Sequence, residues 1–191
     1  MISQEQLLFL SNKENFRLKN QVDASVNKLL YDFQDTIFEL LSQTQYSLPT
    51  KLSKRPGKVT KGNNLKGFPF QVSDFPSAFN KPDIFSFRTT IWYGHFFSFS
   101  LILGGKTKQN HIVDFGKLVN KGYSFVTNET IWETDLKNIG AIDINDNEVT
   151  KIIELSKKSE GFKIFKAYEL NHIDGFKRLG VECFNDLLSR N

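Results

Sequence analysis

Residues that could do chemistry gather around one aromatic segment, Asp83–Leu103 (DIFSFRTTIWYGHFFSFSLIL). Arg88 could hold an anion, and His95 could act as an acid or a base because the unperturbed pKa of histidine lies close to neutral. Trp92 and Tyr93 could form the walls of a pocket beside these two residues, and Asp74 could orient either the arginine or the histidine. The candidate ligand-binding residues are Asp74, Arg88, Trp92, Tyr93 and His95.

The geometry of a strand argues against a single pocket formed by all five side chains. Trp92 and Tyr93 are neighbours in the chain, so a regular strand points them to opposite faces, and only a bulge near Gly94 would bring them together. A guanidinium among buried rings needs a carboxylate or a carbonyl as its partner. We therefore favour a pair between Arg88 and an acid that braces the sheet. We predict that Arg88 and His95 share no pocket with both rings, and that Arg88→Ala lowers mainly stability.

A second candidate site is the basic segment Lys51–Lys66 (KLSKRPGKVTKGNNLK), which contains no acid. Cations on a flexible loop can contact the phosphates of a nucleic acid, and such binding weakens steeply with salt. The segment has no aromatic side chain on which a base could stack, so we favour a solvated surface loop. A nucleic-acid site would use Lys51, Lys54, Arg55, Lys58, Lys61 and Lys66.

Motifs for cofactors and catalysis are incomplete. The segment 104–107 (GGKT) is similar to the end of a phosphate-binding loop, but Ser100 stands where another glycine is required. The three histidines lack zinc-binding spacing, and Cys183 lies in an apolar helical stripe, where we interpret it as a core residue. The sequence therefore predicts no cofactor and no metal. We assign no catalytic residue, and we favour a non-catalytic role.

One acidic segment has calcium-loop spacing. The oxygen-bearing residues Asp143, Asn145, Asn147 and Glu154 fit an EF-hand, but Glu148 replaces the glycine of its sharp turn. A helix that begins with Asn145 as its N-cap accounts for the same oxygens and needs no missing glycine. We favour the helix start.

Length and composition limit the class of protein. The chain of 191 residues suffices for one domain, and 19 phenylalanines can stabilise its core without disulfides or metals. A single cysteine fits a reducing cytoplasm, and the N-terminal segment does not have the pattern of a secretory signal. The uncharged run Thr89–Gly105 lacks the apolar density of a membrane span. We expect a cytoplasmic protein with no membrane contact, and its net charge of +4 does not identify a partner.

Apolar residues at spacings of three and four predict a long helix over about 16–47, preceded by a shorter one around 3–12. We expect the stripe of the long helix to cover the sheet, and a helical dimer is the alternative. A loop over 48–67 follows.

Residues 68–103 alternate as strands do and form the aromatic strand core. Phe97 and Phe99 fall on one face, and Pro69 places its own strand at an edge. Asp74–Pro76 and Lys81–Asp83 are expected to bracket a turn.

The C-terminal part, 108–191, mixes helices and strands. We expect a helix over 108–120, strands over 123–127 and 141–144, and helices over 145–159 and 174–189. The segment 162–170 fits neither period and stays unassigned. The whole chain, 1–191, is predicted to be a single α+β domain. Its antiparallel sheet has four to six strands, with helices mostly on one face.

The segment 64–103 resembles a family of uncharacterised bacterial proteins. The resemblance rests on Gly67–Phe70 (GFPF), Asp74–Pro76 (DFP) and Arg88–Ser98 (RTTIWYGHFFS). It implies a discrete bacterial domain and no particular activity.

We therefore expect a non-catalytic soluble bacterial domain that binds a macromolecular partner or itself, with the 16–47 helix as the surface of a homodimer. One alternative is a small-ligand binder or an enzyme with a pocket at the aromatic segment. The other is weak binding of nucleic acid through the basic segment.

Overall fold

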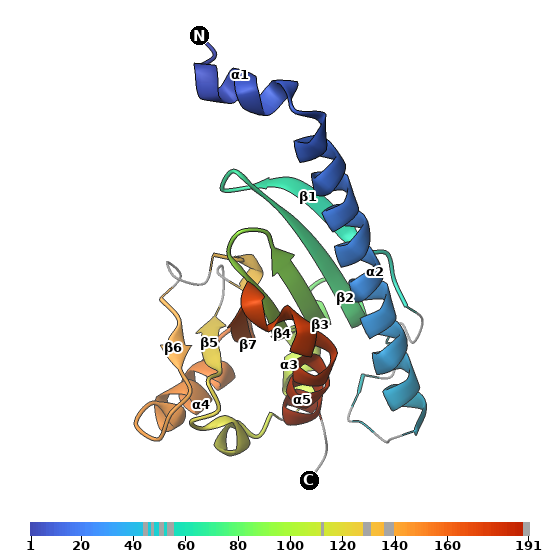
Figure 1. Ribbon diagram of the computed structural model, residues 1–191. Helices are drawn as coiled ribbons and strands as arrows, with labels where there is room; N and C mark the ends of the chain where they lie inside the picture. The colour runs from blue at the N-terminus through green and yellow to red at the C-terminus, as the bar shows by residue number, and fades with distance from the viewer. Residues whose placement is uncertain are drawn as a thin grey trace.

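The computed structural model of the protein describes residues 1–43, 46, 48–49, 52, 56–111, 113–127, 131–135 and 140–188. Its centre is one antiparallel sheet with the strand order β1-β2-β3-β4-β7-β5-β6 (Figure 1). The strands are β1 (Thr60–Leu65), β2 (Phe68–Asn80), β3 (Asp83–Trp92), β4 (Phe96–Gly104), β5 (Ser124–Thr127), β6 (Ile142–Asp143) and β7 (Gly161–Glu169). The predicted α+β class with an antiparallel sheet is confirmed. The predicted number of strands was wrong, because the sheet has seven.

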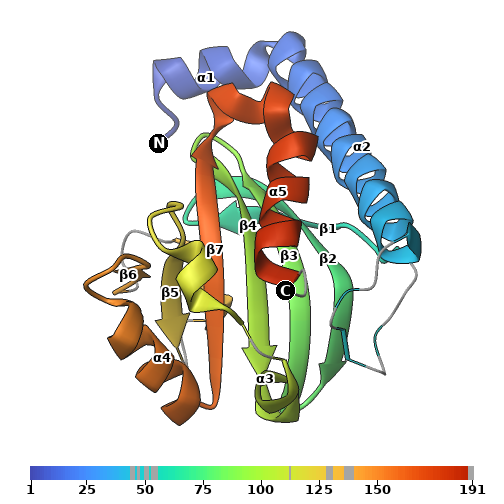
Figure 2. The ribbon, with the colours of Figure 1, turned by 90° about the horizontal axis from the view of Figure 1, so that it is seen from below.

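Two helices, α2 and α5, lie against the same face of the sheet, which we call the helical face (Figure 2). The α-helices are α1 (Gln4–Ser11), α2 (Lys13–Gln43), α3 (Gly105–Asn110), α4 (Val149–Lys158) and α5 (Phe176–Leu188). Two short 3-10 helices, η1 (Phe115–Leu118) and η3 (Leu170–Gly175), complete the described elements.

The core on the helical face is made largely of phenylalanine rings. Phe33 of α2 lies 5.4 Å from Phe99 of β4 and 5.4 Å from Phe176 of α5, measured between ring centroids. The alternation of β4 aims Phe97, Phe99 and Leu101 into this core, and all three are fully buried. Rings at these separations contribute edge and stacking contacts beyond the area that they bury.

The opposite face carries more polar side chains, and we call it the polar face. One row of cross-strand partners runs over six strands of this face: Asp74, Arg88, Ser100, Phe165, Ser124 and Asp143. The segment 131–135 contacts the same face, because the Trp132 ring lies over Arg88 and the Glu133 carbonyl accepts a hydrogen bond from Lys163. The predicted pocket residues are therefore divided between two faces of one sheet.

Two strands were not foreseen. β1 lies inside the predicted 48–67 loop and pairs with β2, so the strand that contains Pro69 is not at an edge. Pro69 lies near the start of β2, where the β1 register shifts, and a missing ladder donor is tolerated at such a place. β7 occupies 161–169, the segment left unassigned. It lies between β4 and β5 with its first five residues buried on both faces, so its sequence does not alternate.

Other predicted boundaries also differ. β2 continues through Asp74–Pro76 to Asn80 with a shift of register between Asp74 and Ser77, so the turn that Asp74–Pro76 and Lys81–Asp83 were expected to bracket lies at residues 81–82 instead. The expected helix over 108–120 is divided into the end of α3 and the short η1. α4 begins at Val149, although the Asn145 side chain does accept from the Glu148 backbone N–H at 3.1 Å. The long helix starts at Lys13 and ends at Gln43; residues 44, 45 and 47 lie outside the described part.

Candidate functional site

The structure separates the five predicted ligand-binding residues into three groups. The first is an ion pair on the polar face between Arg88 of β3 and Asp74 of β2. Arg88 Nε donates to Asp74 Oδ1 at 2.7 Å, and Nη2 donates to Oδ2 at 2.9 Å. Ser86 donates to the same carboxylate at 2.6 Å, and the Trp132 ring centroid lies 4.9 Å from the guanidinium carbon. This is a bidentate pair of the kind that fixes geometry strongly.

The second group is a stack of rings at the β3–β4 turn. The Trp92 and His95 rings are nearly parallel, with centroids 3.7 Å apart, and the Phe68 ring meets His95 edge-on at 4.6 Å. The Trp92 indole N–H donates to the Leu65 carbonyl at 3.2 Å. Among the residues that the structure describes, His95 stacks on Trp92 and meets Phe68, and no contact links its ring to the Arg88–Asp74 pair.

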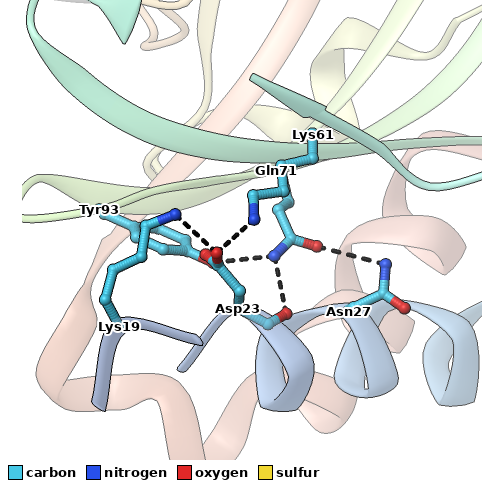
Figure 3. Close-up of polar contacts among 6 residues, drawn as sticks. All are labelled: Lys19, Asp23, Asn27, Lys61, Gln71 and Tyr93. Carbon is cyan, nitrogen blue, oxygen red and sulfur yellow. Dashed lines mark hydrogen bonds and ion pairs between the residues drawn. The ribbon is translucent and has the colours of Figure 1, made fainter. Parts of the chain in front are cut away.

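The third group surrounds Tyr93 on the helical face, where it joins residues that we had not linked to it. Figure 3 shows the side chain of Asp23 from α2 pointing at this hydroxyl and at two ammonium groups. The tyrosine donates to Asp23 Oδ1 at 3.0 Å and accepts from Gln71 Nε2 at 2.8 Å. We call this set the Asp23 cluster: Lys19, Asp23, Asn27, Lys61, Gln71 and Tyr93.

Asp23 is the centre of that cluster and is only 7% exposed. Lys19 donates to its carboxylate at 2.7 Å, and Lys61 of β1 pairs with the same oxygen. Burial works to raise the pKa of the carboxyl, but the hydrogen bonds from the two lysines and Tyr93 outweigh it, so the pKa lies below its usual value. With its oxygens already engaged by three donors, this carboxylate is suited to hold α2 on the sheet and poorly suited to act as a base.

Gln71 extends the cluster along the helix. Its side-chain N–H also donates to the Asp23 carbonyl at 2.9 Å, and Asn27 donates to its oxygen at 3.5 Å. Burial raises the pKa of the Tyr93 hydroxyl to about 12. The cluster thus keeps a neutral phenol and an ionised carboxylate in contact across the seam between α2 and the outer strands. Sequence analysis missed Asp23 and Gln71, since each lies in a segment whose pattern is explained by its apolar residues.

The basic segment gives little support to a nucleic-acid site. Lys51, Lys54 and Arg55 lie outside the described residues, and Lys58 is exposed. Lys61 is paired with Asp23, and Lys66 is paired with Asp135. Cations that already hold carboxylates contribute less to phosphate binding than free ones.

A large apolar surface lies at the N-terminus, in α1 and the first turns of α2, residues 1–22. We call it the N-terminal arm, and Figure 1 shows α1 standing clear of the sheet. Its exposed large apolar side chains are Met1, Ile2, Leu7, Leu8, Phe9, Leu10, Phe16, Leu18 and Val22. The sequence contains the apolar run LLFL at residues 7–10, but a run of four apolar residues does not indicate whether the folded core covers them.

A further polar residue missed by sequence analysis is Lys163 of β7. It is 5% exposed on the polar face, between its cross-strand partners Ile102 and Val126. Beside it, Phe165 lines a cavity of about 470 Å³. A lysine inside the apolar run FKIF was a signal that could have been noticed, because lysine is almost never fully buried unless it is paired.

Comparison of the chain with models of protein families, with curated proteins and with solved structures found no match. The resemblance over 64–103 therefore stays a prediction. Among the described residues, no group of three or more His, Cys, Asp and Glu side chains is placed to hold a metal ion. No helix within the described ranges has both the length and the apolar content needed to cross a bilayer.

Proposed function

We propose that the protein is an interaction module that associates with a second copy of itself through the N-terminal arm. The observation that carries this proposal is the exposure of the arm: α1 has no buried residue, and Leu7, Leu8 and Leu10 are each more than half exposed. Patches on typical monomers reach on the order of 300–600 Å², and larger ones mark interaction sites. The arm gathers nine large apolar side chains that are each exposed by 40% or more.

The pattern of the arm favours a helical partner that surrounds it. The last four apolar residues of α1 are consecutive, so they point to all sides of the helix and not to one stripe. A helix that is apolar all round is stable when several neighbours cover it. Within its own chain, α1 is held by a ring contact between Phe9 and Phe16, with centroids 5.6 Å apart. Two arms packed together would supply four helices, enough to cover both copies of α1.

The charges of the arm fit a second copy better than a nucleic acid. Two of its cations already have partners within the chain, because Arg17 pairs with Glu14 at 2.8 Å and Lys19 pairs with Asp23 at 2.7 Å. Paired charges of both signs do not oppose the approach of a second copy about a two-fold axis. The arm has no cluster of cations that would neutralise a row of phosphates.

The long helix itself is a less suitable surface. Its stripe residues Leu30, Phe33 and Ile37 are buried against the sheet of their own chain, so they are not available for a second copy. We therefore place the proposed dimer contact in α1 and the first turns of α2, and not in the middle of the predicted 16–47 helix.

The test is the mass in solution of the wild-type protein and of Leu8→Glu and Leu10→Glu, measured by size-exclusion chromatography with light scattering over a range of concentrations. We expect a dimer for the wild type and a monomer with unchanged circular dichroism for both variants. Phe38→Glu is the matched control, because Phe38 is 44% exposed on α2 but outside the arm, and it should stay dimeric. A monomeric wild type at all concentrations, or equal dimerisation of all four proteins, would overturn the proposal.

A further inference from the structure

A solvent-accessible cavity of about 470 Å³ lies on the polar face of the sheet, where β7, β5 and β6 are neighbours (Figure 1). Small-molecule sites start at about 300 Å³, so the cavity is large enough for a small ligand. Four of its lining residues have only a methyl group or no side chain at all: Gly122, Gly140, Ala141 and Ala167. The cavity is therefore open because small residues meet where larger side chains would fill the surface.

Two of the lining residues are glycines with backbone conformations that favour glycine. φ is +79° at Gly122 and +63° at Gly140, and each lies two residues before a strand, β5 or β6. Residues other than glycine rarely adopt this left-handed region. A Cβ at Gly140 would meet no atom within 4 Å, so the space beside it is unfilled. The hollow is thus fixed by the way in which both strands begin.

Two phenylalanine rings, Phe96 of β4 and Phe165 of β7, also line the cavity. Phe96 is only partly buried, whereas Phe97 and Phe99 of the same strand are fully buried in the core. Its ring meets the Trp92 ring edge-on at 5.5 Å between centroids, a contact that orients it. The face of an aromatic ring carries partial negative charge and attracts cations. Phe96 belongs to the aromatic segment, although none of the five residues predicted from the sequence lines this cavity.

Asp143 is the one charged side chain among the described residues that line the cavity. The Ser124 hydroxyl donates to Asp143 Oδ1 at 2.7 Å across the β5–β6 pair and so holds the carboxylate in place. The Asp143 side chain is exposed and pairs with no lysine or arginine of the described part of the chain. Because a carboxylate can accept several hydrogen bonds, it keeps acceptor positions for a ligand. Glu169, the cross-strand partner of Phe96, is a second exposed carboxylate on the same face.

The lysines near the cavity have other contacts. Lys121 pairs with Asp186 at 2.6 Å, and Lys166 lies over two tyrosine rings on the helical face. Lys163 donates to a backbone carbonyl, and its ammonium lies 5.3 Å from the centroid of the Phe165 ring. A second cation on Phe165 would meet the charge of Lys163, so we assign Phe165 to apolar contact. Phe96 and Asp143 are left as the groups that attract a cation.

We propose that this cavity binds a small organic cation, a protonated amine on a short apolar body. The ammonium donates to the Asp143 carboxylate and lies over the Phe96 ring, and the apolar body lies against Phe165 and Ala167. A hydrogen bond between an ammonium and a carboxylate is roughly twice as strong as one between neutral groups, so the charge of the ligand decides the selectivity. The proposal does not depend on dimer formation, since no residue of the N-terminal arm lines the cavity.

Three probes that share one ring and differ in charge test the proposal: benzylamine, which is protonated at pH 7, neutral benzyl alcohol, and anionic benzoate. Each is titrated into the isotope-labelled protein, and the shifts of backbone amide signals are followed by NMR. We expect benzylamine to shift the amides of Gly122, Gly140 and Ala141 with a Kd of about 1 mM, a reasonable affinity for a ligand of this size. Benzyl alcohol should bind at least fivefold more weakly, and benzoate should give no saturable shift.

Variants separate the cavity from the rest of the surface. Asp143→Asn should weaken benzylamine about tenfold and leave benzyl alcohol unchanged, whereas Ala167→Leu should fill the cavity and block both probes. Asp146→Asn is the matched control, because Asp146 is an exposed acid three positions further on that bonds to Asn120 and does not line the cavity. It should bind benzylamine as the wild type does, and all variants should keep wild-type circular dichroism. Equal affinity for benzylamine and benzyl alcohol, unchanged binding in Asp143→Asn or Ala167→Leu, or shifts that never saturate would each refute the proposal.

Discussion

Arg88 and Asp74 are direct cross-strand partners on β3 and β2, and their two hydrogen bonds lie next to the place where the register of β2 shifts. A bulge leaves a strand locally without regular ladder bonds. The bidentate pair and the bond from Ser86 to Asp74 provide side-chain contacts across the strands at that point. The pair therefore braces the sheet where its backbone pairing is interrupted.

Removing the Arg88 guanidinium tests how much the stability of the sheet depends on this pair. We expect Arg88→Ala to lower the free energy of unfolding by about 2 kcal/mol, between the small effect of an exposed pair and the larger effect of a buried one, since both side chains are about one-fifth exposed. Urea denaturation followed by circular dichroism measures it. A double-mutant cycle with Asp74→Ala isolates the pair, and a coupling energy near zero would show that the brace is unimportant.

The Asp23 cluster should make stability depend on acid. Because the pKa of Asp23 in the folded protein lies below its ordinary value of 3.8, its contribution is present above about pH 4 and is lost as the pH falls through the folded pKa. We expect Asp23→Asn to destabilise the protein at pH 7 by about 2 kcal/mol, typical of hydrogen bonds to a charged group. Denaturation curves of the variant and the wild type should converge as the pH falls below 4 and through the folded-state pKa. A difference that is constant with pH would contradict the role of the charge.

Tyr93 should make the stability of the protein depend on alkaline pH. Its pKa is about 12 in the folded protein and about 10 when exposed, so its contribution is full below pH 10 and is lost as the pH rises toward 12. We expect Tyr93→Phe to cost about 1 kcal/mol at pH 8, the value of a typical hydrogen bond, and to reduce the alkaline loss of stability. The matched control is Tyr31→Phe, because Tyr31 lies on the same helix as Asp23 and its hydroxyl accepts a long hydrogen bond of 3.4 Å from the Val59 N–H, with no bond to a carboxylate among the described residues. An unchanged alkaline loss in Tyr93→Phe would contradict the assignment.

The sheet could be predicted where its residues alternate and could not where they do not. Phe97, Phe99 and Leu101 alternate with small hydroxyl residues because one face of β4 meets the helices and the other does not, and that contrast is visible in the sequence. β7 lies in the middle of the sheet with both faces covered at its start, so its apolar residues run together and carry no period.

Sites depend on contacts between segments that a single sequence does not connect. The pairing of Arg88 with an acid follows from the need to satisfy a guanidinium, and Asp74 was near enough in the chain to be named. Asp23 meets Tyr93 across 70 positions, and Lys163 meets Glu133 across 30. No spacing rule links such pairs, because the packing of α2 and of the segment 131–135 on the sheet brings them together.

Gly180 of α5 is the position where the packing of the aromatic core is most directly tested. A Cβ at this glycine would lie 2.4 Å from Phe33 Cζ and 2.8 Å from Phe99 Cε1, closer than carbon atoms can approach. In an exposed helix Gly→Ala stabilises by about 1 kcal/mol. Here we expect Gly180→Ala to destabilise by about 1–3 kcal/mol, because the two rings must move within a close-packed core.

The measurement is again urea denaturation, with Gly57→Ala as the control, because a Cβ at Gly57 meets only a carbonyl oxygen at 3.9 Å. That control should change stability by less than about 0.5 kcal/mol, as surface substitutions usually do. Adding Phe33→Leu to Gly180→Ala removes the nearer ring. If the clash is the cause, the double variant should be less destabilised than the sum of the two single variants, since contacting residues are not additive. A stabilised Gly180→Ala would show that α5 does not approach the sheet as closely as the contact between Phe33 and Gly180 requires.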